Sequence, residues 1–270
     1  MNSLAKLVSN LHGVYRACGP GPTLAFAASI AGTLPAVARR HTLRDADARM
    51  ARRAWRFRTQ GIEVELEGRL WSGAREMYCR SVYFPDPRFN LEPGTTVLDL
   101  GANSGLFSLL AALRGCRAIA VEAQYGFIQE IGALARRHGV AERVALEHAL
   151  VGGNRGLLAT PGALEGASHF DGRQPARLTM SELLARHDLD SVDFLKCDIE
   201  GSEFELFDDV AGWLPRVRRI AMEVHSDHGA AASLVRILAD AGFEATLRDN
   251  LSRRVPDLGR ESGYLFALRR

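Results

Sequence analysis

The stretch TVLDLGANSGLFSLLAAL, from Thr96 to Leu113, decides the fold. An apolar run typical of a buried strand carries one acid, Asp99, and is followed by two glycines, Gly101 and Gly105. Gly101 permits a sharp turn and lets a ligand approach the backbone, and Gly105 lets the next helix pack close to the strand. A plain strand-to-helix turn needs only one glycine. The glycine pair with its preceding acid therefore predicts a ligand site.

Short apolar strands alternate with helices along the rest of the chain. The predicted strands are residues 97–100, 117–122, 143–151, 192–198, 220–225, 243–247 and 263–268. This alternation predicts an α/β fold, a mostly parallel sheet with helices on both faces. The last two strands have a short polar connection without room for a crossover helix, so we expect them to pair antiparallel.

The chain before this pattern has a different character. Apolar residues recur at helical spacing over Ser3–Ala17, and residues 41–58 are charged and also read as helical. The period changes at Gly61–Glu67, where apolar residues alternate with glutamates as in a half-exposed strand. We therefore expect a helical N-terminal extension at residues 1–58 and the main domain at residues 59–270. The extension would cover an acceptor pocket or form a homodimer contact.

Composition narrows the function classes. The net charge is +2, with 34 Lys+Arg against 32 Asp+Glu, which gives no reason to expect a nucleic-acid partner. The four cysteines, Cys18, Cys79, Cys116 and Cys197, show no C-x-x-C spacing, and we expect buried, reduced thiols in a cytoplasmic protein. The uncharged stretch Pro20–Ala38 contains prolines, glycines and many small residues, so we expect no stable membrane span.

The second predicted strand ends in an acid, Glu122, that can accept hydrogen bonds from both ribose hydroxyls of a nucleoside cofactor. A dinucleotide fold would use the same acid. However, Leu106 stands where the third glycine of that motif would open the helix, and Asn103 takes the place of its middle glycine. The pocket therefore suits a nucleoside without a pyrophosphate, such as S-adenosylmethionine. Asp99 is expected to face its cationic end.

Polar side chains gather where the fourth and fifth predicted strands end. Asp198 and Glu200 follow the fourth strand, while Glu223 and His225 share one face of the fifth. In an open α/β sheet these strand ends border the ligand site. The group is compatible with an acid–base site or with a metal site. Glu203 and Glu205 could also be acids of the first turn of a helix, where they favour the dipole, and we accept this interpretation for Glu205.

Together these motifs resemble the FkbM family of S-adenosylmethionine-dependent methyltransferases. The matching segments are DLGANSGLFS (Asp99–Ser108), AVEAQYGF (Ala120–Phe127), VDFLKCDIEGSEFELF (Val192–Phe207) and MEVHS (Met222–Ser226). The Lys-x-Asp-x-Glu-Gly element within the third segment is the most specific of them. One departure is Ala123, which stands where the family usually has a proline.

The resemblance implies a Rossmann-like class I methyltransferase with a seven-stranded, mostly parallel sheet whose last strand is antiparallel. Its glycine turn would line the methionine and ribose portions of S-adenosylmethionine, Glu122 would hold the ribose, and His148 with Ala149 would lie by the adenine. The implied cofactor-binding residues are Asp99, Gly101, Ala102, Asn103, Gly105, Glu122, Ala123, His148 and Ala149.

The resemblance also implies O-methylation of a small-molecule hydroxyl acceptor, a sugar or a secondary metabolite. An alcohol must lose its proton as the new bond forms. Asp198 or His225, with Glu223 beside them, would remove it as a general base. Alternatively Asp198, Glu200 and Glu223 would hold Mg²⁺, which acidifies the hydroxyl. Both routes stay open. A nicotinamide-dependent oxidoreductase and a non-catalytic cofactor-binding protein are the competing function classes.

Overall fold

The computed structural model describes residues 3–40, 42–152, 164 and 166–270. The chain divides into two units, Met1–Val82 and Tyr83–Arg270, which we call the N-terminal unit and the sheet unit. This boundary lies later than the one expected between residues 58 and 59. The reason is that a β-hairpin and the helical turns after it join the first unit.

The N-terminal unit is mostly helical. Its helices are α1 (Ser3–Cys18), α2 (Pro20–Ala31), α3 (Leu34–Arg40), α4 (Arg44–Met50) and α5 (Trp71–Ala74), with short turns η1 (Gly68–Leu70) and η2 (Arg75–Cys79), and its hairpin is β1 (Trp55–Thr59) with β2 (Ile62–Leu66). The turn η2 is π-helical. A buried ion pair between Asp47 of α4 and Arg75 of η2 (2.8 Å) anchors its interior, and Trp71 Nε1 also donates to Asp47 at 3.0 Å.

The prediction of helix over residues 41–58 is correct for α4 but wrong for β1. Trp55 and Phe57 are buried, whereas Arg56 and Arg58 are exposed, which is the period of a strand. The hairpin aligns Arg58 with Glu63, and their side chains form an ion pair of 2.7 Å. Arg56 and Arg58 therefore belong to the exposed face of a hairpin and not to a helix.

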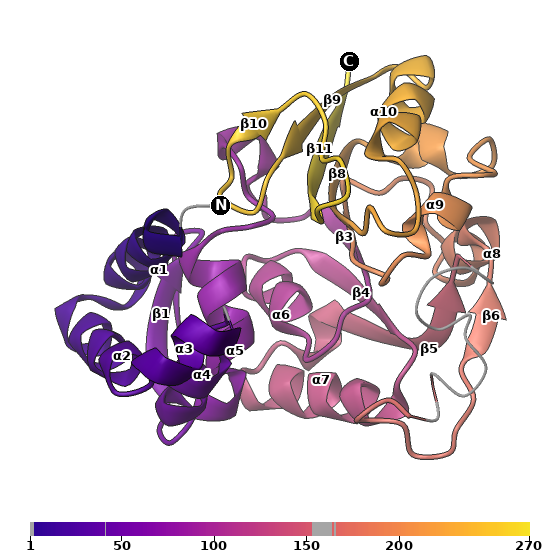
Figure 1. Cartoon of the computed structure of the whole chain (residues 1–270). Coiled ribbons are helices and arrows are strands. Elements are labelled where there is room, and N and C mark those ends of the chain that lie inside the picture. Colours follow the sequence, from indigo (N-terminus) through magenta and orange to yellow (C-terminus); the bar gives the residue numbers. More distant parts are fainter. Residues whose placement is uncertain (1–2, 41, 153–163, 165) are drawn as a thin grey trace. The chain divides into compact units, whose positions relative to one another are not determined.

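The sheet unit alternates strands and helices as expected (Figure 1). Its strands are β3 (Thr96–Leu100), β4 (Arg117–Glu122), β5 (Val144–Val151), β6 (Ala176–Leu178), β7 (Phe194–Cys197), β8 (Arg219–Val224), β9 (Phe243–Arg248), β10 (Arg254–Val255) and β11 (Gly263–Arg269). Its helices are α6 (Leu106–Leu113), α7 (Tyr125–Arg137), α8 (Met180–Arg186), α9 (Glu203–Leu206) and α10 (Ala231–Asp240), with short turns η3 (Pro87–Phe89), η4 (Ala141–Arg143) and η6 (Leu214–Arg216).

These strands form one sheet in the order β10-β9-β11-β8-β7-β3-β4-β5-β6. The seven expected strands are its centre, and the short strands β6 and β10 extend its two edges beyond the prediction. β11 runs antiparallel to both β8 and β9, which confirms the expected antiparallel pair at the end of the chain. The chain order reverses between β3 and β7, which are parallel neighbours.

The two faces of the sheet are covered by different helices. Figure 1 shows α6 and α7 on one side of β3 to β5, with α8 and α9 on the other. Leu98 and Leu100 join the large apolar core that includes α8, α9 and α10, whereas Asp99 points to the α6 side, where Ser108 contacts it. No helix among the described residues has both the length and the hydropathy to cross a lipid bilayer.

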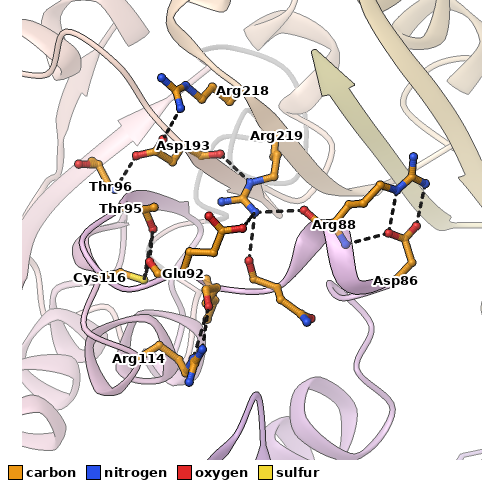
Figure 2. A network of polar contacts seen from close by, with 12 residues as sticks. Asp86, Arg88, Glu92, Thr95, Thr96, Arg114, Cys116, Asp193, Arg218 and Arg219 are labelled. Atoms are coloured by element: carbon orange, nitrogen blue, oxygen red, sulfur yellow. Dashed lines mark hydrogen bonds and ion pairs between the residues drawn. The ribbon is translucent and has the colours of Figure 1, made fainter. Parts of the chain in front are cut away.

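The edge of the sheet where β3, β7 and β8 begin is fastened by an arginine network (Figure 2). Arg219 Nη1 donates to the carbonyl oxygens of Arg88 (3.0 Å) and Asn90 (3.1 Å), and its Nε donates to the carbonyl of Asp193 (3.1 Å). One half-buried guanidinium thus ties the segment before β3 to the starts of β7 and β8. This network lies where the strands begin, whereas the candidate site described below lies where they end.

Replacing Arg219 by alanine is expected to lower the free energy of unfolding by about 1–3 kcal/mol, because several backbone carbonyls lose a charged donor. Arg218→Ala is the matched control, since its side chain is 70% exposed and makes one 3.5 Å ion pair with Asp193. The free energy of unfolding of Arg218→Ala should fall by less than about 0.5 kcal/mol. Urea denaturation of both variants measures the difference, and equal losses would contradict the role of Arg219.

Candidate active site

The candidate site lies where β3 and β7 end side by side, at the point where the strand order reverses. Asp198 N–H donates to the carbonyl of Leu100 at 3.1 Å. Gly101 has φ +70°, and a Cβ at this position would lie 1.8 Å from the carbonyl oxygen of Asp198. Only glycine permits this approach, so the neighbouring strand end by itself requires the first glycine of the motif.

The rest of the turn is equally constrained. Gly105 has φ +77°, and its Cβ would meet the side chain of Ile131 in α7 at 2.7 Å. Asn103 adopts φ +51°, a left-handed conformation that asparagine tolerates better than most residues. Its backbone N–H donates to Glu122 Oε2 at 2.8 Å. Asn103 and Glu122, both predicted to bind the cofactor, are therefore in direct contact.

Glu122 is the carboxylate that organises the turn. Its Oε1 accepts from Gln124 N–H at 2.9 Å, and the side chain is almost fully buried at the end of β4. Burial raises the pKa of Glu122 above its usual range, although the backbone donors and the nearby Lys196 oppose the rise. A carboxylate has about four lone-pair positions, so Glu122 retains acceptor capacity beside its backbone hydrogen bonds. The geometry therefore fits a group that holds ribose hydroxyls.

Asp99 is not positioned to face the cationic end of a cofactor, which was the expectation from the sequence. Its side chain is fully buried, its Oδ2 accepts from Ser108 Oγ at 2.7 Å, and its Oδ1 forms a 3.2 Å ion pair with Lys196 Nζ. No surface of Asp99 is left to face the cationic end of a cofactor. Lys196 also donates to the carbonyl of Gly101 at 2.6 Å. The Asp99–Lys196 pair thus supports the glycine turn from its buried side.

The two residues expected near the adenine, His148 and Ala149, have different surroundings. His148 Nε2 lies 2.9 Å from the carbonyl oxygen of Ala123, which joins the ends of β4 and β5. The ring of Tyr125 meets His148 edge-on at 5.2 Å. Ala149 is buried in the large core, and Ala102 is buried against α7. His148 and Ala123 therefore lie together, whereas the methyl groups of Ala149 and Ala102 serve packing.

Asp198 has a buried tyrosine, Tyr83, as its hydrogen-bond partner. Tyr83 donates its hydroxyl to Asp198 Oδ2 at 2.9 Å. Its ring is held edge-on by Phe107 and Tyr264. Burial and then the charge of Asp198 raise the pKa of Tyr83 well above its usual value, so the phenol stays protonated and donates. Tyr83 therefore fixes the orientation of the Asp198 carboxylate.

Glu203 has a larger role in the site than its sequence position indicated. It is fully buried, and its Oε1 accepts from both His225 N–H (2.7 Å) and His225 Nδ1 (2.9 Å). Its Oε2 accepts from Gly201 N–H at 2.8 Å. Glu203 thus fixes both the β8 end and the loop after β7. An acid that reads as an ordinary helix-start residue holds the imidazole in place.

His225 lies between two carboxylates. Its Nε2 is 3.4 Å from Glu200 Oε2, on the side of the ring away from Glu203. Burial opposes the charged imidazole, but the hydrogen bond and the charge of Glu203 outweigh it and raise the pKa of His225 to about 9. At neutral pH His225 is therefore a cation that neutralises its acidic neighbours.

The predicted metal set needs correction. Among the residues that the structure describes, Asp198, Glu200 and His225 offer ligand atoms that all lie within 4.8 Å of one another, and Glu223 is not in this group. Glu223 lies in β8 beside Tyr264 of β11, and its charge contributes to raising the pKa values of Tyr83 and His225. It is therefore near the site, but outside the group of three candidate ligands.

The family model described as the methyltransferase FkbM domain matches residues 99–245, more than half of the chain. The chain belongs to the FkbM methyltransferase family. This membership makes it a methyltransferase and implies S-adenosylmethionine as the methyl donor, in place of the nicotinamide alternative. The glycine turn and the strand-end acids described above all fall within, or border, the matched segment.

One relative and two solved structures illustrate which individual proteins are similar to this chain. The 31-O-demethyl-FK506 methyltransferase FkbM of Streptomyces tacrolimicus is 29% identical over 193 residues, which cover 57% of this chain and 74% of that protein. Among solved structures, an rRNA methylase from Streptococcus thermophilus has a TM-score of 0.43 at 10% identity, covering 66% of this chain and 89% of that one. A precorrin-6y C5,15-methyltransferase from Geobacter metallireducens has a TM-score of 0.41 at 15% identity, covering 68% and 84%.

Proposed function

We propose that this protein is an S-adenosylmethionine-dependent O-methyltransferase that acts on a hydroxyl group of a sugar or secondary metabolite. The acceptor class is supported by the relative from Streptomyces tacrolimicus, whose name places the methyl group on an oxygen. The single observation that carries the proposal is the close approach of the Gly101 backbone to the Asp198 carbonyl group. The cofactor turn and the polar acceptor-side residues approach there to backbone contact.

The cofactor side of this junction is held by backbone and carboxylate groups. S-adenosylmethionine supplies an electrophilic methyl group. Glu122 would accept hydrogen bonds from the ribose hydroxyls, and the left-handed turn at Asn103 keeps the backbone close to the ligand. Lys196 keeps the Gly101 carbonyl in place from the buried side. These residues bind and position, which is the main demand of an in-line transfer.

On the acceptor side, a hydroxyl has to lose its proton as it attacks. Asp198, with one oxygen fixed by Tyr83, would accept a hydrogen bond from the acceptor hydroxyl and orient it. His225 keeps Nδ1 on Glu203, so Nε2 would take up the proton in the neutral form of the imidazole, which becomes abundant only as the pH approaches about 9. We therefore assign His225 as the base and Asp198 as the orienting carboxylate. The competing route is a divalent ion, Mg²⁺ in the simplest case, bound by Asp198, Glu200 and His225.

Glu122→Ala and Asp198→Asn should separate the two halves of the site. Glu122→Ala is expected to weaken binding of S-adenosylhomocysteine by about tenfold or more, because the ribose hydroxyls lose their acceptor. Asp198→Asn should leave that affinity nearly unchanged and lower turnover by about 10²-fold. Calorimetry measures the affinity, and methyl transfer to a panel of hydroxyl compounds measures turnover.

Two results would count against the proposal. The first is no heat of binding for the wild-type protein at millimolar S-adenosylhomocysteine. The second is an equal loss of affinity in both variants, which would show that the assigned roles are not separate. Repeating the turnover assay after chelation and again with added Mg²⁺ distinguishes base catalysis from the metal route.

A further inference from the structure

Two free thiols meet inside the N-terminal unit. Cys18 and Cys79 are sixty-one positions apart in sequence, yet their Sγ atoms lie 4.0 Å from each other. Cys18 is the last residue of α1, and Cys79 is the last residue of the π-helical turn η2. A disulfide has an S–S length of about 2.05 Å, so the sulfur atoms would have to approach by roughly 2 Å. We propose that Cys18 and Cys79 are a modification site, forming a reversible disulfide with a low-molecular-weight disulfide such as oxidised glutathione as oxidant.

The two thiols meet at the end of a closely packed seam between α1 and η2. Gly13 of α1 lies directly over the backbone of Cys79, because a Cβ there would be 2.6 Å from the Cys79 carbonyl oxygen. Nearer the start of α1, Asn10 Oδ1 accepts a hydrogen bond from Arg75 at the start of η2. Backbone packing and a buried polar contact therefore hold the two elements together without any help from the thiols.

The chain beside Cys18 leaves room for the remaining movement. Gly19 follows Cys18 with φ +83°, and nothing lies within 4 Å of the position that its Cβ would occupy. The end of α1 is thus less crowded than the part beneath Gly13. A small rotation of the Cys18 side chain, together with an adjustment at Gly19, can bring the two sulfur atoms to bonding distance.

The two thiols differ in a way that sets the order of the reaction. Cys18 is partly exposed, which departs from the expectation that all four thiols are buried, whereas Cys79 is buried. The hydrogen bond with Cys18 and then burial raise the pKa of Cys79 well above its usual value. Cys79 is therefore a poor first nucleophile, and Cys18 meets the oxidant first.

The chemistry then proceeds in two exchanges. The Cys18 thiolate attacks the disulfide of oxidised glutathione, which forms a Cys18–glutathione mixed disulfide and releases one glutathione thiolate. The Cys79 thiolate next attacks the Cys18 sulfur and releases the second glutathione. The two cysteine thiols lose two electrons and two protons, and one oxidised glutathione becomes two reduced molecules. Because Cys79 has to ionise, alkaline pH accelerates the second exchange.

The other two cysteines serve as internal controls. Cys116 and Cys197 are buried in the sheet unit. Cys116 Sγ contacts Thr95 Oγ1 and donates to the carbonyl of Glu92. Burial raises the pKa of Cys197 well above its usual value. Neither thiol should react under conditions that oxidise Cys18.

The test is to incubate the full chain with oxidised glutathione at pH 8.5 and count thiols after denaturation. The count is expected to fall from four to two, the intact mass to fall by two hydrogen atoms, and a peptide linking Cys18 to Cys79 to appear. Dithiothreitol should restore four thiols. Retention of four thiols, or a wild-type protein that keeps glutathione on Cys18, would overturn the proposal.

Cys79→Ser tests the order of the two exchanges. This variant should stop at the mixed disulfide and gain the mass of one glutathione on Cys18, whereas Cys116→Ser should still lose two thiols as the wild type does. A Cys79→Ser protein that takes up no glutathione would show that Cys18 is not the entry point.

A matched glycine pair tests whether packing at the seam sets the rate. Gly13→Ala places a methyl group against the Cys79 carbonyl, and we expect disulfide formation to slow by roughly tenfold, which corresponds to about 1.4 kcal/mol. Gly21→Ala is the control, because nothing lies within 4 Å of its added Cβ. Circular dichroism checks that both variants fold. Equal rates in the two variants would contradict the inferred seam.

Discussion

Replacing Lys196 by methionine is expected to lower the free energy of unfolding by about 3–5 kcal/mol. The ammonium group is almost fully buried, and it is 3.2 Å from Asp99, which is fully buried. Burial by itself lowers the pKa of Lys196, but the charges of Asp99 and Asp198 outweigh it and raise that pKa, so the lysine is charged. Methionine would leave Asp99 as an uncompensated charge with Ser108 as its hydrogen-bond donor.

A double variant shows whether the loss comes from the stranded charge. Asp99→Asn together with Lys196→Met removes both charges, and it should recover a large part of the stability that Lys196→Met loses. Urea denaturation of the wild type, both single variants and the double variant completes the cycle. A single-variant loss below about 1 kcal/mol would contradict the buried ion pair. The recovered double variant should still bind S-adenosylhomocysteine weakly, because the Gly101 carbonyl has lost its 2.6 Å donor.

Much of the fold could be predicted from apolar runs and turn residues. Strands β3, β4, β7 and β8 are buried on both faces, so each appears as a mostly apolar run in the sequence. The edge strands β6 and β10 have only three and two residues and carry no such signal. The hairpin strand β1 was missed because its arginines dominate the composition. The alternation of Trp55 and Phe57 with those arginines was the available signal.

The location of the candidate site was predictable from the sequence, but the contacts and burial of its acidic residues were not. Strand ends can be located from sequence, which was enough to bring Gly101, Glu122, Asp198 and His225 to one edge of the sheet. Which acid is buried depends on the neighbouring strand, and that pairing is not local. Asp99 lies directly beside Lys196 across the β3–β7 pair, so the lysine takes the carboxylate that the cofactor was expected to meet.

Glu203→Gln is expected to move the pH dependence of methyl transfer to lower pH. Glu203 holds the pKa of His225 at about 9, so the imidazole is protonated at neutral pH and cannot accept a proton. If neutral His225 is the base, wild-type turnover rises with pH and is half-maximal near pH 9. Glutamine keeps a carbonyl acceptor for Nδ1 but removes the charge, so the pKa of His225 should fall toward its ordinary value of 6.5.

The same shift makes an independent prediction for stability. A histidine whose pKa is raised on folding stabilises the protein fully below its unfolded pKa, and this contribution disappears as the pH rises through the folded pKa. The wild-type free energy of unfolding should therefore decline between pH 6.5 and about 9, and Glu203→Gln should flatten this decline. Glu205→Gln removes the same charge two residues away and should change neither profile. Turnover with an unaltered pH profile in Glu203→Gln, together with a flattened stability profile, would show that His225 is a fixed cation and that Asp198 takes the proton.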